Sequence, residues 1–307
     1  MKVKYRKWLS KNTESLVGKT VAVTGSTGGL GYEICNYLAY LGASLLLLDR
    51  NRKRSEEHKA KILSAYPEIS VKCFTADLSD ISSVEDLIVK IEGEKIDVLI
   101  HNAGAYSIPR CKTSTGYDNV FQINFISPYY ITRRLIDILS SRGARVVVVG
   151  SIAHNYSKTK SFDMDFSENP HASKVYGNAK RYLMYSLSDL LNNTPGVSVS
   201  VTHPGIAFTN ITSHYPKLIF AIIKYPMKLI FMHPRRAALS ILYGVFNETK
   251  ECEWIGPCLF DVWGMPKKKK LNTAKKDERI YISSSAEDIY AKIISEREGE
   301  PKNENQV

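Results

Sequence analysis

The sequence predicts an α/β fold, a doubly wound parallel sheet in a single domain of about seven strands. Short apolar segments alternate with helical patterns along most of the chain, which is typical of a parallel sheet covered by helices on both faces. The spacing never breaks, and no internal repeat or low-complexity linker divides the chain. A glycine-rich turn joins the first apolar segment to the first helical pattern. These observations favour one domain over two.

The expected elements follow one another from residue 19. The run at 43–49 is continuous enough to indicate a strand buried on both faces. Further strands are expected at 20–24, 71–75, 98–100, 146–149, 197–201 and 254–262. Helical patterns occupy 30–41, 53–65, 82–92, 118–139 and 173–193, and a capping-box pattern opens a short last helix over 285–298. The domain is therefore expected to span residues 19–298.

Basic residues crowd both ends of the chain. Residues 1–18 form a basic N-terminal extension, Lys267 to Lys270 are expected to form a solvated turn, and 299–307 to be a disordered tail. The formal net charge of +11 fits an anionic cofactor together with basic ends. Neither basic cluster is interleaved with aromatic residues, as a surface for single-stranded nucleic acid would be. A nucleic-acid partner is not expected.

Cysteine usage and hydropathy indicate a cytoplasmic protein. The five cysteines are scattered and contain no Cys-x-x-Cys pair, so neither a structural zinc site nor a disulfide framework is expected. The basic N-terminus is not followed by an apolar core of signal-peptide length. No uncharged apolar run reaches the length of about 18 residues that a membrane-spanning helix needs. We expect no metal and a reducing compartment.

The glycine-rich turn predicts a dinucleotide pocket. Its spacing, Thr-Gly-x-x-x-Gly-x-Gly, leaves room for a backbone to pass close to a phosphate. The helix that follows would direct its free N–H groups and its positive dipole end at that phosphate. Such turns also occur for packing alone, so the later motifs must decide. The residues expected to contact the cofactor here are Gly25, Ser26, Thr27, Gly29, Leu30 and Gly31.

The second strand ends in two residues that favour different cofactors. Asp49, about 20 residues after the turn, is placed to accept hydrogen bonds from the two ribose hydroxyls of NAD. Arg50 could instead hold the 2′-phosphate of NADP. The carboxylate would repel that phosphate, and the turn adds no balancing positive charge. The sequence alone therefore leans towards NAD, with NADP left open.

The third and fourth strands end in further polar or small residues. Asp77 and Leu78 follow the third strand, and Asp77 could accept a hydrogen bond from the adenine amino group. Asn102, Ala103 and Gly104 follow the fourth and allow a tight turn beside the cofactor. Open α/β sheets bind ligands at the carboxyl ends of their strands, so these residues extend the predicted pocket.

Four residues carry the predicted chemistry. Tyr176 and Lys180 lie four residues apart in a helical pattern, so their side chains share one face of the helix. An ammonium within about 4–6 Å, together with a positive nicotinamide ring, would lower the pKa of the phenol towards neutrality. Ser151, directly after the fifth strand, would hold the substrate oxygen, and Asn124 would support Lys180 through a water.

Each residue alone has an ordinary structural explanation, but the order of all these motifs resembles the short-chain dehydrogenase/reductase family. The resemblance covers 19–298, and it extends to Pro204-Gly205 after the sixth strand. Within the family the chain is most similar to the retinol dehydrogenase-like branch. The narrower match rests on 149–154, 163–166 and 202–205.

The resemblance implies an NAD(P)-dependent oxidoreductase that interconverts an alcohol and its aldehyde or ketone, with a lipophilic substrate. It implies catalytic roles for Asn124, Ser151, Tyr176 and Lys180, and cofactor contacts from Tyr176, Lys180, Pro204 and Gly205. Dimers, which would make a homodimer, or tetramers through the helices at 118–139 and 173–193 would also resemble the family, and the sequence leaves the oligomeric state open. Two residues depart from the pattern. His101 replaces the usual first Asn of Asn-Asn-Ala-Gly, and Asp49 stands where many members of the branch have a small or neutral residue.

Two questions stay open at the level of sequence. The apolar segment 216–232 is expected to be a lid over the substrate, a membrane-surface helix with its lysines towards lipid headgroups, or a surface helix packed on the protein's own core. A non-catalytic dinucleotide sensor or scaffold is the alternative function. A sugar-nucleotide epimerase shares Tyr-x-x-x-Lys, but it spaces its glycines more tightly and carries a larger C-terminal domain.

Overall fold

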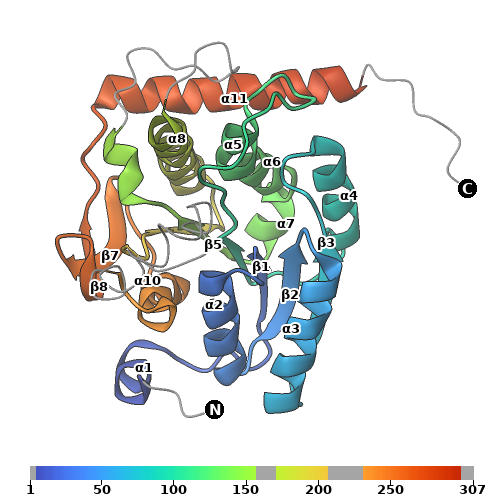
Figure 1. Ribbon diagram of the computed structural model, residues 1–307, viewed down its shortest axis with the longest axis vertical. Helices are drawn as coiled ribbons and strands as arrows, with labels where there is room; N and C mark the ends of the chain where they lie inside the picture. The colour runs from blue at the N-terminus through green and yellow to red at the C-terminus, as the bar shows by residue number, and fades with distance from the viewer. Residues whose placement is uncertain (1–4, 157–170, 207–230, 299–307) are drawn as a thin grey trace, which may run out of the picture.

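The computed structural model describes residues 5–156, 171–206 and 231–298 (Figure 1). Its centre is an eight-stranded sheet in the order β3-β2-β1-β4-β5-β6-β7-β8, parallel except for the last strand. The strands are β1 (Thr20–Thr24), β2 (Ser44–Asp49), β3 (Val71–Thr75), β4 (Val98–His101), β5 (Arg145–Val149), β6 (Ser198–Thr202), β7 (Glu253–Leu259) and β8 (Trp263–Lys270). The chain crosses from β3 back to β4 beside β1, which creates the switch point where such sheets bind ligands.

Helices cover both faces of the sheet (Figure 1). One apolar core lies under α4 (Ile81–Ile91), α6 (Ser127–Arg134), α8 (Ala172–Asn192) and α11 (Lys276–Glu298). The other lies under α1 (Arg6–Asn12), α2 (Gly29–Tyr40), α3 (Arg52–Ala65) and α10 (Pro234–Phe246). The central strands are buried along nearly their whole length, as their continuous apolar runs predict.

The structure corrects the number of strands and the two ends of the domain. The expected solvated turn at 267–270 is the end of β8, which pairs antiparallel with β7 from Glu253–Lys270 to Leu259–Trp263. The basic extension contains α1, whose Leu9 is buried against the second core. The expected short last helix begins about nine residues earlier than 285, as the 23-residue α11.

The expected helix at 118–139 is interrupted. It divides into α5 (Asn119–Phe121), a π-helical turn (Gln122–Ile126), α6 and α7 (Ile136–Ser141). Asp118 begins the series, because its carboxylate accepts hydrogen bonds from the backbone N–H groups of Val120 and Phe121 at 2.8 and 3.2 Å. A π-helical turn re-aims the side chains within it, and Asn124 lies at its middle.

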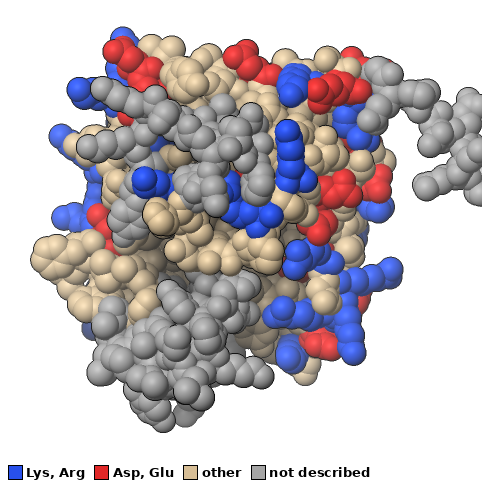
Figure 2. Space-filling view, turned by 45° about the horizontal axis from the view of Figure 1, so that its top comes forward, with Lys and Arg blue, Asp and Glu red and all other residues tan. Residues whose placement is uncertain are grey.

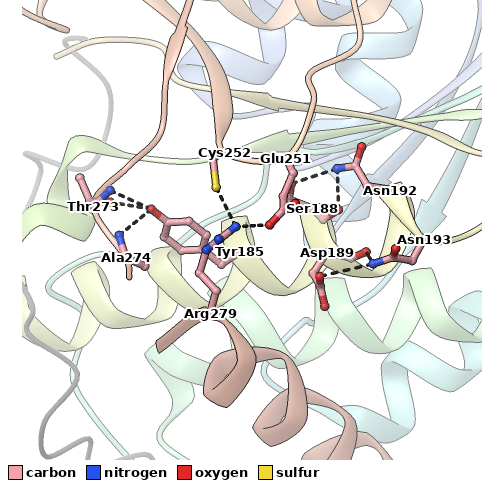
Figure 3. A network of polar contacts seen from close by, with 10 residues as sticks. All are labelled: Tyr185, Ser188, Asp189, Asn192, Asn193, Glu251, Cys252, Thr273, Ala274 and Arg279. Atoms are coloured by element: carbon pink, nitrogen blue, oxygen red, sulfur yellow. Dashed lines mark hydrogen bonds and ion pairs between the residues drawn. The ribbon is translucent and has the colours of Figure 1, made fainter. Parts of the chain in front are cut away.

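Helix α11 lies across α8 and α6 (Figure 1), the helices through which a homodimer is expected. Its buried face consists of Ile282, Ala286, Ile289 and Ile293. The segment before it is fastened to α8, because the Tyr185 hydroxyl contacts Thr273 and accepts from the N–H of Ala274 at 3.0 Å (Figure 3). Arg279 adds contacts to Glu251 and Cys252 beside β7 (Figure 3).

Among the described residues, no helix has the length and apolarity that crossing a membrane requires. The expected lid or membrane segment at 216–232 lies outside them, apart from Phe231 and Met232. The residues at 163–166 and the expected tail at 299–307 also lie outside the described ranges.

Candidate active site

The glycine-rich turn is locked against the end of β4. Gly25 adopts a left-handed conformation with φ of +67°, and a Cβ there would come within 2.9 Å of the Ala103 Cα. Asn102 donates from Nδ2 to the carbonyl oxygens of Thr24 at 2.9 Å and Gly25 at 3.1 Å. The Thr24 hydroxyl in turn accepts from the N–H groups of Asn102 and Ala103, both at 3.0 Å. The structure therefore brings the two predicted motifs together.

The start of α2 has the features of an anion site. Gly28 precedes the helix, and no side chain caps its first turn. A Cβ on Gly31 would collide with the Gly25 carbonyl oxygen and lie 2.9 Å from Asn102 Nδ2, so only glycine allows the backbone to approach this closely. Asn102 Oδ1 is buried and has no hydrogen-bond partner among the residues that the structure describes. Uncapped N–H groups beside such a cradle fit the phosphates of a dinucleotide.

The Asp49 carboxylate, which was expected to bind the cofactor ribose, forms hydrogen bonds within the chain. Its side chain is buried, and its Oδ1 accepts from the N–H of Thr27 at 3.1 Å and from the Thr27 hydroxyl at 3.2 Å. Its Oδ2 accepts from the hydroxyls of Ser26 and of Ser55, the latter at 3.0 Å. The carboxylate thus faces the turn and α3, and sequence reasoning missed the contribution of Ser55.

The residues after β3 also bond within their own turn. The Asp77 carboxylate accepts from the N–H of Ser79 at 2.9 Å and from its hydroxyl at 2.7 Å. Arg50 lies 3.9 Å from the other carboxylate oxygen in an exposed ion pair. The Leu78 carbonyl accepts from the Ser127 hydroxyl at 2.7 Å, which ties this turn to α6. Asp77 lies two residues after the end of β3, but its carboxylate already has partners.

Tyr176 and Lys180 project from α8 towards the end of β5. Lys180 is buried and donates from Nζ to the carbonyl oxygen of Val149, the last residue of β5, at 3.0 Å. Its Nζ lies 5.9 Å from the centre of the Tyr176 ring. Ser151, two residues after β5, accepts from the N–H of Ala153 at 3.2 Å, which fixes the start of the following turn. The strand end and the helix therefore meet as the sequence predicts.

Asn124 reaches the same site from the π-helical turn. It donates from Nδ2 to the carbonyl oxygens of Ala105 and Val120, both at 2.8 Å, and its Oδ1 accepts from the N–H of Ala105 at 3.2 Å. A Cβ on Gly104 would lie 2.8 Å from Asn124 Oδ1 and 3.4 Å from Lys180 Nζ. Gly104 therefore keeps the space in which the asparagine and the lysine approach one another.

Burial dominates the ionisation of both groups on α8. Desolvation raises the pKa of Tyr176 to about 12, against the opposing effect of its hydrogen bond with Ser151. Desolvation also lowers the pKa of Lys180 to about 8. Burial therefore has the largest effect on the phenol here, and the expected lowering of the Tyr176 pKa, which involves a bound nicotinamide ring as well as Lys180, stays a prediction. The phenol holds its proton at neutral pH and can donate it.

Tyr106 borders the site and was missed by sequence reasoning. Its ring meets the Tyr176 ring edge-on, with 5.2 Å between the centroids. Its position two residues after Asn-Ala-Gly is the signal that could have found it.

Gly205 follows Pro204 after β6 with a φ of +81°, and a Cβ there would collide with Met232 and the Val262 carbonyl. Gly205 therefore allows the chain to turn after β6.

Comparison with known proteins agrees with this geometry. A family model described as short chain dehydrogenase matches residues 19–217. The chain is 30% identical to short-chain dehydrogenase TIC 32 A, chloroplastic, of Brassica napus over 76% of this chain and 77% of the relative. It is 29% identical to human polyprenol dehydrogenase over 78% and 75% of the two chains. It is also 29% identical to human retinol dehydrogenase 14 over 74% and 73%.

The fold is likewise that of a solved structure. An uncharacterised protein from Mycobacterium paratuberculosis superimposes with a TM-score of 0.73, at 21% identity, over 91% of this chain and 95% of that one. The family model spans more than half of the chain, and it includes the glycine-rich turn and the end of α8 that carries Tyr176 and Lys180. The chain belongs to the short-chain dehydrogenase/reductase family of NAD(P)-dependent oxidoreductases acting on CH–OH groups.

Proposed function

We propose that the protein interconverts a lipophilic alcohol and its aldehyde or ketone, with Tyr176 as the general acid and base. The observation that supports this most is the meeting of three side chains at one place. Tyr176 and Lys180 reach the end of β5 from α8, and Ser151 leaves that strand two residues later. The uncapped start of α2 lies at the same edge of the sheet.

The chemistry divides between the cofactor and the chain. The nicotinamide cofactor, when bound, supplies or accepts the hydride. In reduction, Tyr176 donates its proton to the carbonyl oxygen, since its raised pKa keeps the phenol protonated. In oxidation, Tyr176 takes the hydroxyl proton, and a positive charge beside it is needed to favour the phenolate. Ser151 orients the substrate oxygen, and Asn124 supports the position of Lys180.

The relatives support a lipophilic substrate. Two of them are named for retinol and polyprenol, which are apolar alcohols. The sequence segment 216–232, which follows the site in the chain, is also the most apolar stretch of the protein. As the lid that the sequence allows, this segment would favour apolar substrates, because it would bury their surface together with its own.

Turnover measurements test this function. The purified protein is offered NADH and NADPH with a panel of lipophilic aldehydes and ketones, and the reverse panel of alcohols with NAD and NADP. Tyr176→Phe is expected to lower turnover by about a thousandfold or more while cofactor binding persists. Tyr185→Phe is the matched control on the same helix, since its hydroxyl contacts Thr273 rather than Ser151.

The same experiment distinguishes an oxidoreductase from the alternative function, a non-catalytic protein that binds the dinucleotide. Cofactor binding without turnover on any alcohol or carbonyl would indicate a dinucleotide sensor or scaffold. Substantial turnover by Tyr176→Phe on an established substrate would show that another group handles the proton.

A further inference from the structure

We propose that His154 is a positioning residue that fixes the direction of the Ser151 hydroxyl, and so the place at which the substrate oxygen is held. The proposal rests on the proposed function, in which Ser151 orients that oxygen beside Tyr176. His154 acts through Ser151 and not on the substrate itself. Its role follows from the construction of the turn at 151–156, which we call the Ser151 turn.

The carbonyl oxygen of Ser151 accepts two hydrogen bonds from one residue. The backbone N–H of His154 lies 3.2 Å from it and opens the 3-10 helical turn Ile152–Tyr156. The imidazole Nδ1 of His154 lies 2.6 Å from the same oxygen. A carbonyl oxygen only accepts, so Nδ1 carries the proton of the neutral ring. Together the two contacts fix the peptide group that follows Ser151, and with it the backbone from which the hydroxyl projects.

The Ser151 hydroxyl is directed by the same turn. Its oxygen accepts from the N–H of Ala153 at 3.2 Å, which occupies one lone pair and leaves the hydroxyl proton to donate. The hydroxyl also forms a hydrogen bond with the Tyr176 phenol. A rotation of the turn would carry this proton away from the substrate oxygen, and displacements of about 1 Å are costly for catalysis.

Aromatic packing holds the His154 ring in place. The ring has no exposed surface, and it meets the Trp254 ring of β7 edge-on, with 5.3 Å between the centroids. The indole also stacks on the His203 ring at 5.0 Å, and His203 donates from Nε2 to the carbonyl oxygen of Asp261 at 2.8 Å. Burial lowers the pKa of His154, against the effect of its bond with Ser151, so the imidazole is neutral at pH 7.

The backbone of the Ser151 turn is fastened to α8. Arg181 donates from Nη1 to the carbonyl oxygen of His154 at 3.1 Å and from Nε to Glu278 at 2.7 Å. Many Lys and Arg side chains lie on the surface of the molecule (Figure 2), whereas Arg181 is only 3% exposed. A Cβ on Gly177 would collide with the Ala153 carbonyl, so α8 passes directly against the turn. The turn is therefore anchored at His154, and the imidazole carries that anchoring back to Ser151.

Two substitutions separate the hydrogen bond of His154 from its packing. His154→Asn keeps a donor, because the amide Nδ2 is bonded to Cγ just as the imidazole Nδ1 is. His154→Phe keeps a ring beside Trp254 but has no donor. A positioning role predicts that asparagine preserves activity and phenylalanine does not, whereas a role in packing alone predicts the reverse order.

Steady-state kinetics of the full chain, on a substrate found in the turnover panel, measure this difference. We expect His154→Phe to lower kcat by about tenfold, the scale of one lost hydrogen bond, and to leave KM for the nucleotide unchanged. His154→Asn should keep kcat within about threefold of the wild type. Tyr185→Phe is the matched control, since it removes buried hydrogen bonds to residues 273 and 274 (Figure 3) and should leave kcat unchanged.

A double-mutant cycle with Ser151→Ala shows whether His154 acts through Ser151. Without the hydroxyl, a positioning residue has nothing left to direct, so adding His154→Phe to Ser151→Ala should lower kcat no further. A residue that only supports the fold would lower kcat by the same factor in both backgrounds. Melting curves of all the variants show how much stability each one loses.

Hydrogen exchange tests the same contacts without substrate or cofactor. The amides of Ala153 and His154 both donate to Ser151, so their exchange reports directly on the Ser151 turn. Both should exchange faster in His154→Phe and stay protected in His154→Asn. If His154→Phe does not fold, Trp254→Phe serves in its place, because it loosens the packing of the imidazole and keeps the donor. It should lower kcat less than tenfold and quicken the same two amides.

Two outcomes would overturn the inference: a wild-type kcat in His154→Phe, or an equal further loss when His154→Phe is added to Ser151→Ala. Absence of turnover by the wild type with every substrate and nucleotide would instead count against the proposed function. The exchange of the two amides would then decide by itself whether the imidazole holds the Ser151 turn, and unchanged protection in His154→Phe would refute that.

Discussion

The side chain of Asn124 packs so closely against Gly104 that there is no room for a Cβ at residue 104, which would lie 2.8 Å from Asn124 Oδ1. The same carbon would lie 3.4 Å from Lys180 Nζ. Gly104→Ala should therefore displace the asparagine or the lysine and lower kcat by about tenfold or more, because small displacements of positioned groups are costly. Steady-state kinetics and a melting curve together measure this.

Gly93→Ala is the control for that substitution, because no atom lies within 4 Å of a Cβ at that position. It should leave kcat and stability almost unchanged. Equal losses of kcat in the two variants would show that the effect at Gly104 is not local.

Acid should destabilise the fold through His58. Its ring is buried and stacks on Tyr32 at 4.3 Å, and neither ring nitrogen has a partner in the described part of the chain. Its pKa is about 4 in the folded protein and about 6.5 when unfolded, so the unfolded state binds the proton first as the pH falls. This one group should therefore lower the free energy of unfolding between pH 6.5 and 4, by up to about 1.4 kcal/mol per pH unit.

His58→Phe keeps the stacked ring and removes the titration. Urea denaturation from pH 7 to pH 4 should give a shallower loss of stability for this variant than for the wild type. His171→Phe is the control, since that side chain is exposed at the start of α8 and meets solvent in both states. An unchanged slope in His58→Phe would show that the imidazole is already protonated in the fold.

Asp118 should be an important carboxylate for stability. It is fully buried, begins α5, and forms an ion pair with Arg110 at 2.7 Å. Asp118→Asn should lower the free energy of unfolding by about 2–4 kcal/mol, because the half-buried Arg110 guanidinium loses its buried counter-charge. Asp80→Asn, at the exposed start of α4, should cost only about 0.5 kcal/mol, since asparagine caps helices as well as aspartate does. Comparable losses in urea denaturation would contradict this account.

The packing of α11 can be tested by two isoleucines of the same helix. Ile282 has no exposed surface, whereas Ile280 is 58% exposed. Ile282→Ala should lower the free energy of unfolding by about 2–4 kcal/mol, and Ile280→Ala by less than about 0.5 kcal/mol. If both variants unfold like the wild type in chemical denaturation, α11 does not belong to the cooperative core.

Much of the sheet could be predicted from the sequence. Apolar runs predict β1 to β6 to within one residue at either end, because strands buried on both faces must be apolar throughout; only the edge strand β3 is partly exposed. The residues proposed for catalysis could also be placed, since strand ends and the four-residue spacing on a helix locate side chains without tertiary information.

Contacts between distant elements could not be predicted in this way. The direction of Asp49 depends on Ser55, which α3 brings to it, and the high pKa of Tyr176 depends on how deeply the fold buries it. The lysines at 267–270 read as a turn because the last strand of a sheet is solvated and lacks the apolar pattern. The π-helical turn at Asn124 likewise leaves no sign in the apolar spacing.

The last strand also has features that oppose pairing between copies of this protein. β8 ends the sheet, and its outer edge offers backbone groups to which a strand from another molecule could pair. Lys267, Lys268 and Lys270 are exposed along it, and a second β8 alongside would bring like charges into register. Pro266 supplies no N–H for such pairing. The residues that disguise this strand in the sequence therefore protect the molecule from edge-to-edge aggregation.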